Sequence, residues 1–177
     1  MLGGVRARLL SKLKDGGMAL YVKFRAGNSD RCFVSQVLDS DDVLIQTAAG
    51  TSVVRLYGID APERNQKGGH AAFDKLRSLA HQKAFTFERY GRDKYGRLVA
   101  DLRFEDGRRL SVEMVRAGCA WWYKRFAFRD AELQEAEKEA RRDRRGLWKE
   151  EDPTAPWNWR RRRVCARRQR SKASSSS

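Results

Sequence analysis

Arg55, Asp60 and Glu63 are the residue types that a metal-dependent phosphodiesterase requires, and they surround the end of one predicted strand. They lie in the stretch VVRLYGIDAPERNQ, where Pro62 terminates the strand. Proline cannot donate a hydrogen bond to a β-ladder, and it biases the residue before it toward an extended conformation. The carboxylates of Asp60 and Glu63 are therefore predicted to lie at the rim of a sheet.

A second acidic turn precedes this stretch. The segment VLDSDDVLI carries Asp39, Asp41 and Asp42 between two apolar runs that are typical of strands. Acidic turns are common in their own right, because an aspartate accepts hydrogen bonds from the nearby backbone. Two such turns separated by a single hairpin can nevertheless converge on one cation, so this pair predicts a metal site.

A third segment, RDKYGRLVA, has a turn signal at Tyr95–Gly96 and places Arg97 at the start of an apolar run. Taken in chain order, VLDSDD, RLYGIDAPE and DKYGR resemble the thermonuclease family, the Ca²⁺-dependent nucleases similar to staphylococcal nuclease. The match extends from about Arg31 to Pro156. Any one motif alone is explained by an ordinary solvated turn, whereas three motifs in the family's order make the resemblance specific.

The resemblance implies a calcium site. Asp41 and Asp60 would ligate Ca²⁺ together with the backbone carbonyl of Ala61, and Glu63 would be the general base or the group that positions water. Calcium takes about six to eight oxygen ligands, so two carboxylates and one carbonyl leave positions for water and a substrate phosphate. A site with open positions is the kind that catalysis needs.

The resemblance also implies how the substrate is held. Arg55 and Arg97 would bind the scissile phosphate, and Tyr95 would lie against the nucleotide. Arginine suits this role because its planar fork can bind phosphate through two hydrogen bonds. Members of the family attack phosphorus with the 5′ oxygen leaving. The implied activity is therefore sugar-nonspecific cleavage of DNA and RNA that leaves 3′-phosphate ends.

Two features of the motifs bear on activity. Where the family shows Asp-Gly-Asp-Thr, this chain has DSDD, so Ser40 replaces a glycine and Asp42 adds a third acid. A side chain at a position that needs positive φ would be strained or would reshape the turn.

In a regular strand Arg55 and Asp60 would face opposite sides, so a break is needed between them, and Gly58 is its predicted place.

Aromatic and basic residues alternate in the segment WWYKRF. Trp121, Trp122 and Tyr123 are predicted to stack on bases of single-stranded DNA or RNA beside basic groups that contact the backbone. The alternative for either tryptophan is packing in the core. Trp157 and Trp159 are expected to fold back onto the domain rather than to bind substrate.

Hydrophobic periodicity predicts the elements that position these groups. Alternating or apolar runs predict five strands, at residues 32–38, 43–47, 52–59, 84–89 and 98–104. Helical spacing and end signals predict three helices, at residues 69–82, 111–118 and 130–145. This order fits a small closed barrel. It matches the α+β fold that the resemblance implies, a five-stranded OB-type barrel with three helices, and basic disordered tails are predicted to flank it.

The positive charge lies mostly in the tails. The chain has 177 residues and a formal charge of +15, of which residues 1–30 carry +4, residues 31–152 carry +3 and residues 153–177 carry +8. This distribution predicts a basic N-terminal extension at 1–30, a nuclease-like domain at 31–159 and an Arg-rich, Ser-ending disordered tail at 160–177. The tails are candidates for sequence-independent binding to phosphates.

Other site types and compartments receive little support. The three cysteines are far apart and lack metal-ligand spacing, which gives neither a disulfide framework nor a zinc site. The first 30 residues contain no apolar run long enough for a signal peptide or a membrane span. A monomer without stable membrane insertion is expected. The compartment stays open: cytoplasmic by default, exported by analogy with the family.

Two alternatives to the nuclease remain. The first is a non-catalytic nucleic-acid-binding module of the nuclease type, in which catalytic carboxylates are typically lost. Asp41, Asp60, Glu63, Arg55 and Arg97 are all present here, which disfavours it. The second is a basic scaffold protein whose tails perform its function. An assay of cleavage with calcium and with a chelator separates these interpretations.

Overall fold

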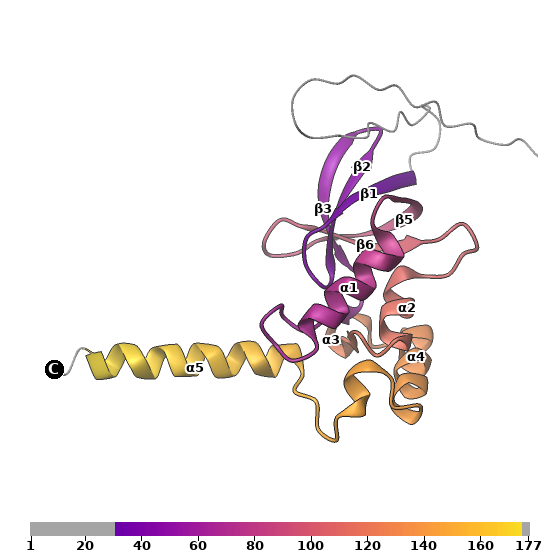
Figure 1. Cartoon of the computed structure of the whole chain (residues 1–177). Coiled ribbons are helices and arrows are strands. Elements are labelled where there is room, and N and C mark those ends of the chain that lie inside the picture. The colour runs from indigo at the N-terminus through magenta and orange to yellow at the C-terminus, as the bar shows by residue number, and fades with distance from the viewer. Residues whose placement is uncertain (1–30, 175–177) are drawn as a thin grey trace, which may run out of the picture.

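Five strands close into a barrel, as the sequence predicts. The computed structural model describes residues 31–174, and their side chains as far as residue 166; the predicted extension at 1–30 lies outside the described residues. The barrel order is β1-β2-β3-β6-β5 (Figure 1). Its strands are β1 (Arg31–Val37), β2 (Asp42–Thr47), β3 (Gly50–Leu56), β5 (Lys83–Arg92) and β6 (Leu98–Arg103).

Strand pairing fixes the surroundings of Arg55. β2 and β3 form an antiparallel hairpin in which Asp42 lies opposite Arg55. On its other edge β3 pairs in parallel with β6, and Arg55 there lies beside Val99. The remaining barrel pairs are antiparallel. The arginine of one motif is therefore flanked by the strand that follows the first acidic turn and by the strand that follows the Tyr-Gly turn.

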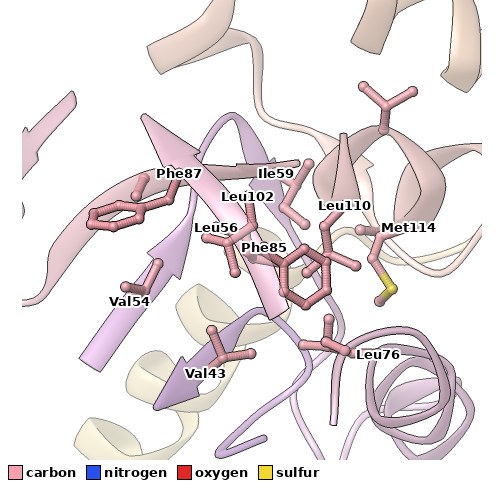
Figure 2. Close-up of a cluster of buried hydrophobic side chains, with 14 of the residues drawn as sticks. Val43, Val54, Leu56, Ile59, Leu76, Phe85, Phe87, Leu102, Leu110 and Met114 are labelled. Carbon is pink, nitrogen blue, oxygen red and sulfur yellow. The ribbon is translucent and has the colours of Figure 1, made fainter. Parts of the chain in front are cut away.

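The barrel interior is apolar and continuous with two helices. Alternate residues of the strands point inward, among them Val43, Val54 and Leu56. Leu76 of α1 (Gly69–Ala80) and Met114 of α2 (Leu110–Arg116) join the same buried cluster (Figure 2). Each such side chain contributes about 1.5–3 kcal/mol by leaving water, which makes the barrel a firm support for the polar groups at its rim.

The described part of the chain has five α-helices, where the sequence predicts three. α1, α2 and α4 (Ala131–Arg142) are the predicted ones. Asp130 caps the N-terminus of α4, because its side chain accepts a hydrogen bond from the Leu133 amide. The additional helices are α3 (Lys124–Ala127) and α5 (Pro156–Ser174), and a 3₁₀ turn, η1, spans Gly146–Lys149. None of the helices in the described part is both long and apolar enough to cross a membrane.

Helix α5 corrects one expectation about the C-terminal tail. The segment from residue 160 is predicted to be disordered, yet it is helical as far as Ser174. Proline at the first helical position and a run of arginines favour a helix, although the segment has no apolar face to bury. The prediction of disorder rests on the eight basic residues without an acid and on the low-complexity serine-rich end. The domain boundary at 159 itself remains a prediction.

A second, smaller apolar cluster anchors the C-terminal part. Trp121, Ala140, Leu147, Trp148 and Ala155 are buried together, and Trp157 packs against them. Trp121 and Trp122 form β7, which pairs with β4 (Ile59–Asp60). The strand that ends in Asp60 is therefore held both by the barrel and by this cluster.

Candidate active site

Asp41 and Asp60 lie at the rim of the barrel and share Arg55. One terminal nitrogen of Arg55 donates to Asp41 Oδ1 at 2.5 Å, and the other donates to Asp60 Oδ1 at 2.8 Å. Asp41 Oδ2 accepts a hydrogen bond from the Ala61 amide at 2.8 Å. Asp60 is completely buried. The two acidic turns therefore converge, as their spacing predicts.

Gly58 is the break that allows this arrangement. β3 ends at Leu56, and β4 starts at Ile59, so the chain turns between Arg55 and Asp60. Gly58 has a φ of +74°, which L side chains rarely adopt. The break places two residues of opposite strand parity on one side, and it confirms the position predicted from the sequence.

The carboxylates crowd enough negative charge to perturb their titration. Burial, together with the nearby Asp60 and Asp42, raises the pKa of Asp41 to about 7 against the opposing effect of Arg55. Burial lowers the pKa of Arg55, but the three aspartates outweigh burial and hold it above its ordinary value. Burial likewise raises the pKa of Asp42, against the guanidiniums of Arg55 and Arg97. This site favours additional positive charge.

Arg97 reaches the same rim through the extra acid. It donates to Asp42 Oδ2 at 2.5 Å and, through Nε, to Asp93 Oδ2 at 2.7 Å. Tyr95 is 71% exposed, and the Arg97 guanidinium lies 5.4 Å from its ring centroid. Asp42, at the family's threonine position, therefore holds the arginine predicted to bind phosphate, a role that the sequence alone did not assign.

Ser40, at the family's glycine position, is accommodated without positive φ. Its side chain is buried, and its hydroxyl donates to the Gly69 carbonyl at 3.3 Å. Its amide donates to Asp39 Oδ1 at 2.8 Å. The departure from the family motif therefore carries no left-handed backbone strain, and it ties the acidic turn to the start of α1.

Glu63 lies beside Asp60 and is bonded to a residue that sequence reasoning missed. Arg160 donates to Glu63 Oε1 at 2.8 Å and to Asp60 Oδ2 at 2.6 Å. The two partners are separated from Arg160 by about a hundred positions in the chain. The only sequence signal for it is helical spacing, because Arg160 lies three residues after Trp157, which packs on the domain.

The aromatic residues predicted to stack on bases, Trp121, Trp122 and Tyr123, have other partners in the structure. Trp121 and Trp122 are only 4% and 6% exposed, and the Trp122 indole donates to the Ala127 carbonyl. The prediction that this pair stacks on bases is therefore wrong, because both rings are buried. Tyr123 stacks on Trp157 with ring centroids 5.4 Å apart. Both rings line a cavity of about 970 Å³ together with the basic residues Lys124, Arg125, Arg141, Arg144 and Lys149.

The donor set is suited to a hard cation. No three His, Cys, Asp or Glu side chains in the described part of the chain are arranged as a ready metal cluster. Asp41 and Asp60 nevertheless offer carboxylate oxygens at one point, and the buried Asp42 Oδ1 has no hydrogen-bond partner. A guanidinium already lies against Asp60 and Glu63. These oxygens fit Ca²⁺ or Mg²⁺, with other ligands drawn from carbonyls and water.

Comparisons with known proteins show which family the chain resembles. A family model described as Staphylococcal nuclease homologue matches residues 53–150. The chain is 38% identical over 130 residues to a protein named uncharacterized endonuclease from Escherichia coli, covering 73% of this chain and 84% of the relative. It is 35% identical over 153 residues to a micrococcal nuclease of Shigella flexneri, covering 81% and 88%. It is 40% identical over 108 residues to a probable staphylococcal-like nuclease of Oryza sativa subsp. japonica, covering 61% of this chain and 32% of the plant protein.

Proposed function

Because the chain belongs to the staphylococcal nuclease family, we propose that it is a Ca²⁺-dependent, sugar-nonspecific endonuclease. It hydrolyses phosphodiester bonds of DNA and RNA, with single strands preferred, and leaves 3′-phosphate ends. The observation that carries the proposal is the pair of buried carboxylates, Asp41 and Asp60, bridged by Arg55 at the barrel rim. Two carboxylates buried at one point are costly unless cations neutralise them, which supports a divalent-ion site beside Arg55.

The metal site consists of oxygen ligands from two turns. Asp41 and Asp60 would hold the cation together with the carbonyl of Ala61, and the orphaned oxygen of Asp42 lies nearby. Bound calcium would supply positive charge to the phosphoryl oxygens as negative charge develops on them. Arg55 keeps the two carboxylates apart from each other and fixed in direction, because it donates to both at once.

The remaining residues act on phosphate and water. Arg97, oriented by Asp42 and Asp93, would bind the scissile phosphate with Arg55 and stabilise its charge in the transition state. Glu63 would accept the proton of the attacking water as the oxygen–phosphorus bond forms and the 5′ oxygen leaves. The exposed ring of Tyr95 would lie against the nucleotide. The chain is expected to act as a monomer.

Cleavage in calcium and in chelator tests the proposal. Single-stranded DNA and RNA should be cut with Ca²⁺ and not at all in excess chelator. Mg²⁺ should support cleavage poorly, because it demands near-ideal octahedral geometry and the site offers few protein ligands. Glu63→Gln should lower kcat by ~10² to 10⁴. Glu135→Gln is the matched control, because Glu135 is an exposed ion-pair residue of α4 and should leave the rate unchanged. Binding without cleavage under all these conditions would instead identify a non-catalytic nucleic-acid-binding module.

A further inference from the structure

The first turn of α5 places one guanidinium across two acidic residues of the site. Arg160 donates to both oxygens of Asp60, at 2.6 Å and 3.2 Å, and to Glu63 Oε1 at 2.8 Å. Asp60 is fully buried and Glu63 is 31% exposed, whereas the Arg160 side chain is 43% exposed. The guanidinium therefore covers the acidic pair from the solvent side.

This position is set by the anchor of α5. Trp157 packs against Trp121 and stacks on Tyr123. Gln66 donates to the Thr154 carbonyl at 2.5 Å, which ties the entry of α5 to the loop that carries Glu63. Residues 161–166 are exposed, and the helix extends away from the rest of the described chain (Figure 1). Only the first turn of α5 is thus held at the site.

The Arg160 guanidinium supplies the positive charge that a metal ion would supply at Asp60 and Glu63. Asp60 Oδ1 is shared between Arg55 and Arg160, while Arg160 is the hydrogen-bond partner of Asp60 Oδ2. The same guanidinium occupies Glu63. A metal ion on Asp60 and a water molecule on Glu63 both require oxygens that Arg160 now binds. Guanidinium and metal are alternatives at these atoms.

We infer that Arg160 is a tethered competitor of the catalytic cation, which neutralises Asp60 and Glu63 in the metal-free protein and has to leave before calcium and water can bind. This inference rests on the proposed function, because it takes Asp60 as a metal ligand. Departure needs only rotation of a long, partly exposed side chain, since the anchor of α5 lies at Trp157 and Ala155. Arg160 then inhibits the site in the metal-free protein, and bound calcium displaces it.

Competition has a measurable size. When a site is available in only a fraction of molecules, its apparent dissociation constant rises by the inverse of that fraction. If Arg160 closes the site in about nine molecules of ten, Arg160→Ala should bind Ca²⁺ about tenfold more tightly. Arg160→Lys keeps the charge but lacks a fork that spans both carboxylates, so it should lie between the wild type and alanine.

Calorimetric titration of the full chain with Ca²⁺, without substrate, tests this directly. Arg161→Ala is the matched control, because Arg161 is an exposed neighbour on α5 that donates a hydrogen bond to Asn158 of the same helix; its calcium affinity should equal that of the wild type. Thermal unfolding in chelator adds a second measurement. Arg160→Ala should melt below the wild type there, because Asp60 loses a partner, and the gap should close at saturating Ca²⁺.

The outcomes separate the two hypotheses. Equal calcium dissociation constants for the wild type and Arg160→Ala would overturn the competition and leave the proposed nuclease intact. An Arg160→Ala variant with unchanged calcium affinity but a large loss of kcat would also overturn it, and would place Arg160 on the substrate instead. Absence of calcium binding in every variant would overturn the metal site and with it the proposed function.

Discussion

At the scale of single residues, the site combines buried aspartates with arginines. Asp60 accepts hydrogen bonds from both Arg55 and Arg160, whereas Asp41 accepts from Arg55 alone of the two. Asp41 has one oxygen on Arg55 and the other on the Ala61 amide, but it lies next to two further aspartates. Burial and those neighbours favour its neutral form, whereas a bound divalent cation would favour its ionised form. The titration of Asp41 therefore reports on the cation site.

The stability of the metal-free protein should fall as pH rises through the range in which Asp41 titrates. Its pKa is about 7 in the folded chain against an ordinary value of 3.8, so between these values the folded state holds a proton that the unfolded state has lost. The free energy of unfolding should then decrease by at most about 1.4 kcal/mol per pH unit and level off above pH 7.

Denaturant unfolding in chelator at several pH values measures this slope. Asp41→Asn is the comparison, because it removes the titrating group and should flatten that part of the profile. Adding Ca²⁺ should stabilise the wild type more at pH 8 than at pH 5.5, since the ionised carboxylate is the ligand. Parallel profiles for wild type and Asp41→Asn would contradict the assignment.

At the scale of elements, a two-residue turn joins β3 to β4 and aims both strands at one site. Gly58 lies at its centre, with Tyr57 donating its backbone amide to the Ala100 carbonyl of β6. A Cβ on Gly58 would lie 2.5 Å from Leu133 Cδ1 and 3.0 Å from Ala127 Cβ. A side chain at position 58 is therefore disfavoured both by the positive φ and by the close packing of α3 and α4.

Gly58→Ala should cost stability and activity together. The positive φ costs of order 1–3 kcal/mol, and the contact with Leu133 adds overpacking. Gly107→Ala is the matched control, because Gly107 has a φ of +85° but a Cβ added there would meet nothing within 4 Å. It should lose stability from φ alone and keep full kcat. Similar kcat values in both variants would show that the Gly58 turn does not position Arg55 and Asp60.

At the scale of the whole molecule, positive charge is concentrated at the C-terminal end. The segment after Asp152 carries +8 of the chain's +15, and Arg160 alone among its described side chains reaches the acidic site. The tail therefore has two parts. Arg160, near the start of α5, is the proposed competitor of the cation. The basic residues after it can contribute sequence-independent affinity for phosphates.

Removal of residues 167–177 should weaken substrate binding and leave the chemical step unchanged. It deletes four basic residues, at positions 167, 168, 170 and 172, but retains Arg160. KM should rise, and the slope of log KM against log salt should fall by at most about 3 for a single strand, with kcat little changed. Glutamine at those four positions in the full-length chain is the length-matched control. A collapse of kcat with normal melting would show that the distal tail enters the site.

The sequence by itself determined the barrel and three of the helices, whereas the roles of Asp41, Asp60, Glu63, Arg55 and Arg97 come from the resemblance to the family and stay a prediction. It could do so because period-two alternation, helix end signals and the turn residues Gly58 and Pro62 are local properties. The break between Arg55 and Asp60 followed from strand parity alone. The convergence of the two acidic turns followed from the single hairpin between them.

Only the tertiary structure decided which side chains are covered and which acids hold which arginine. Trp121 and Trp122 have the same local pattern whether they stack on bases or pack in a core, and burial in the fold chose the core. The bond from Arg160 to Asp60 joins positions 100 residues apart, so it depends on where the Trp157 anchor places α5. Such long-range contacts arise from packing, which local spacing does not encode.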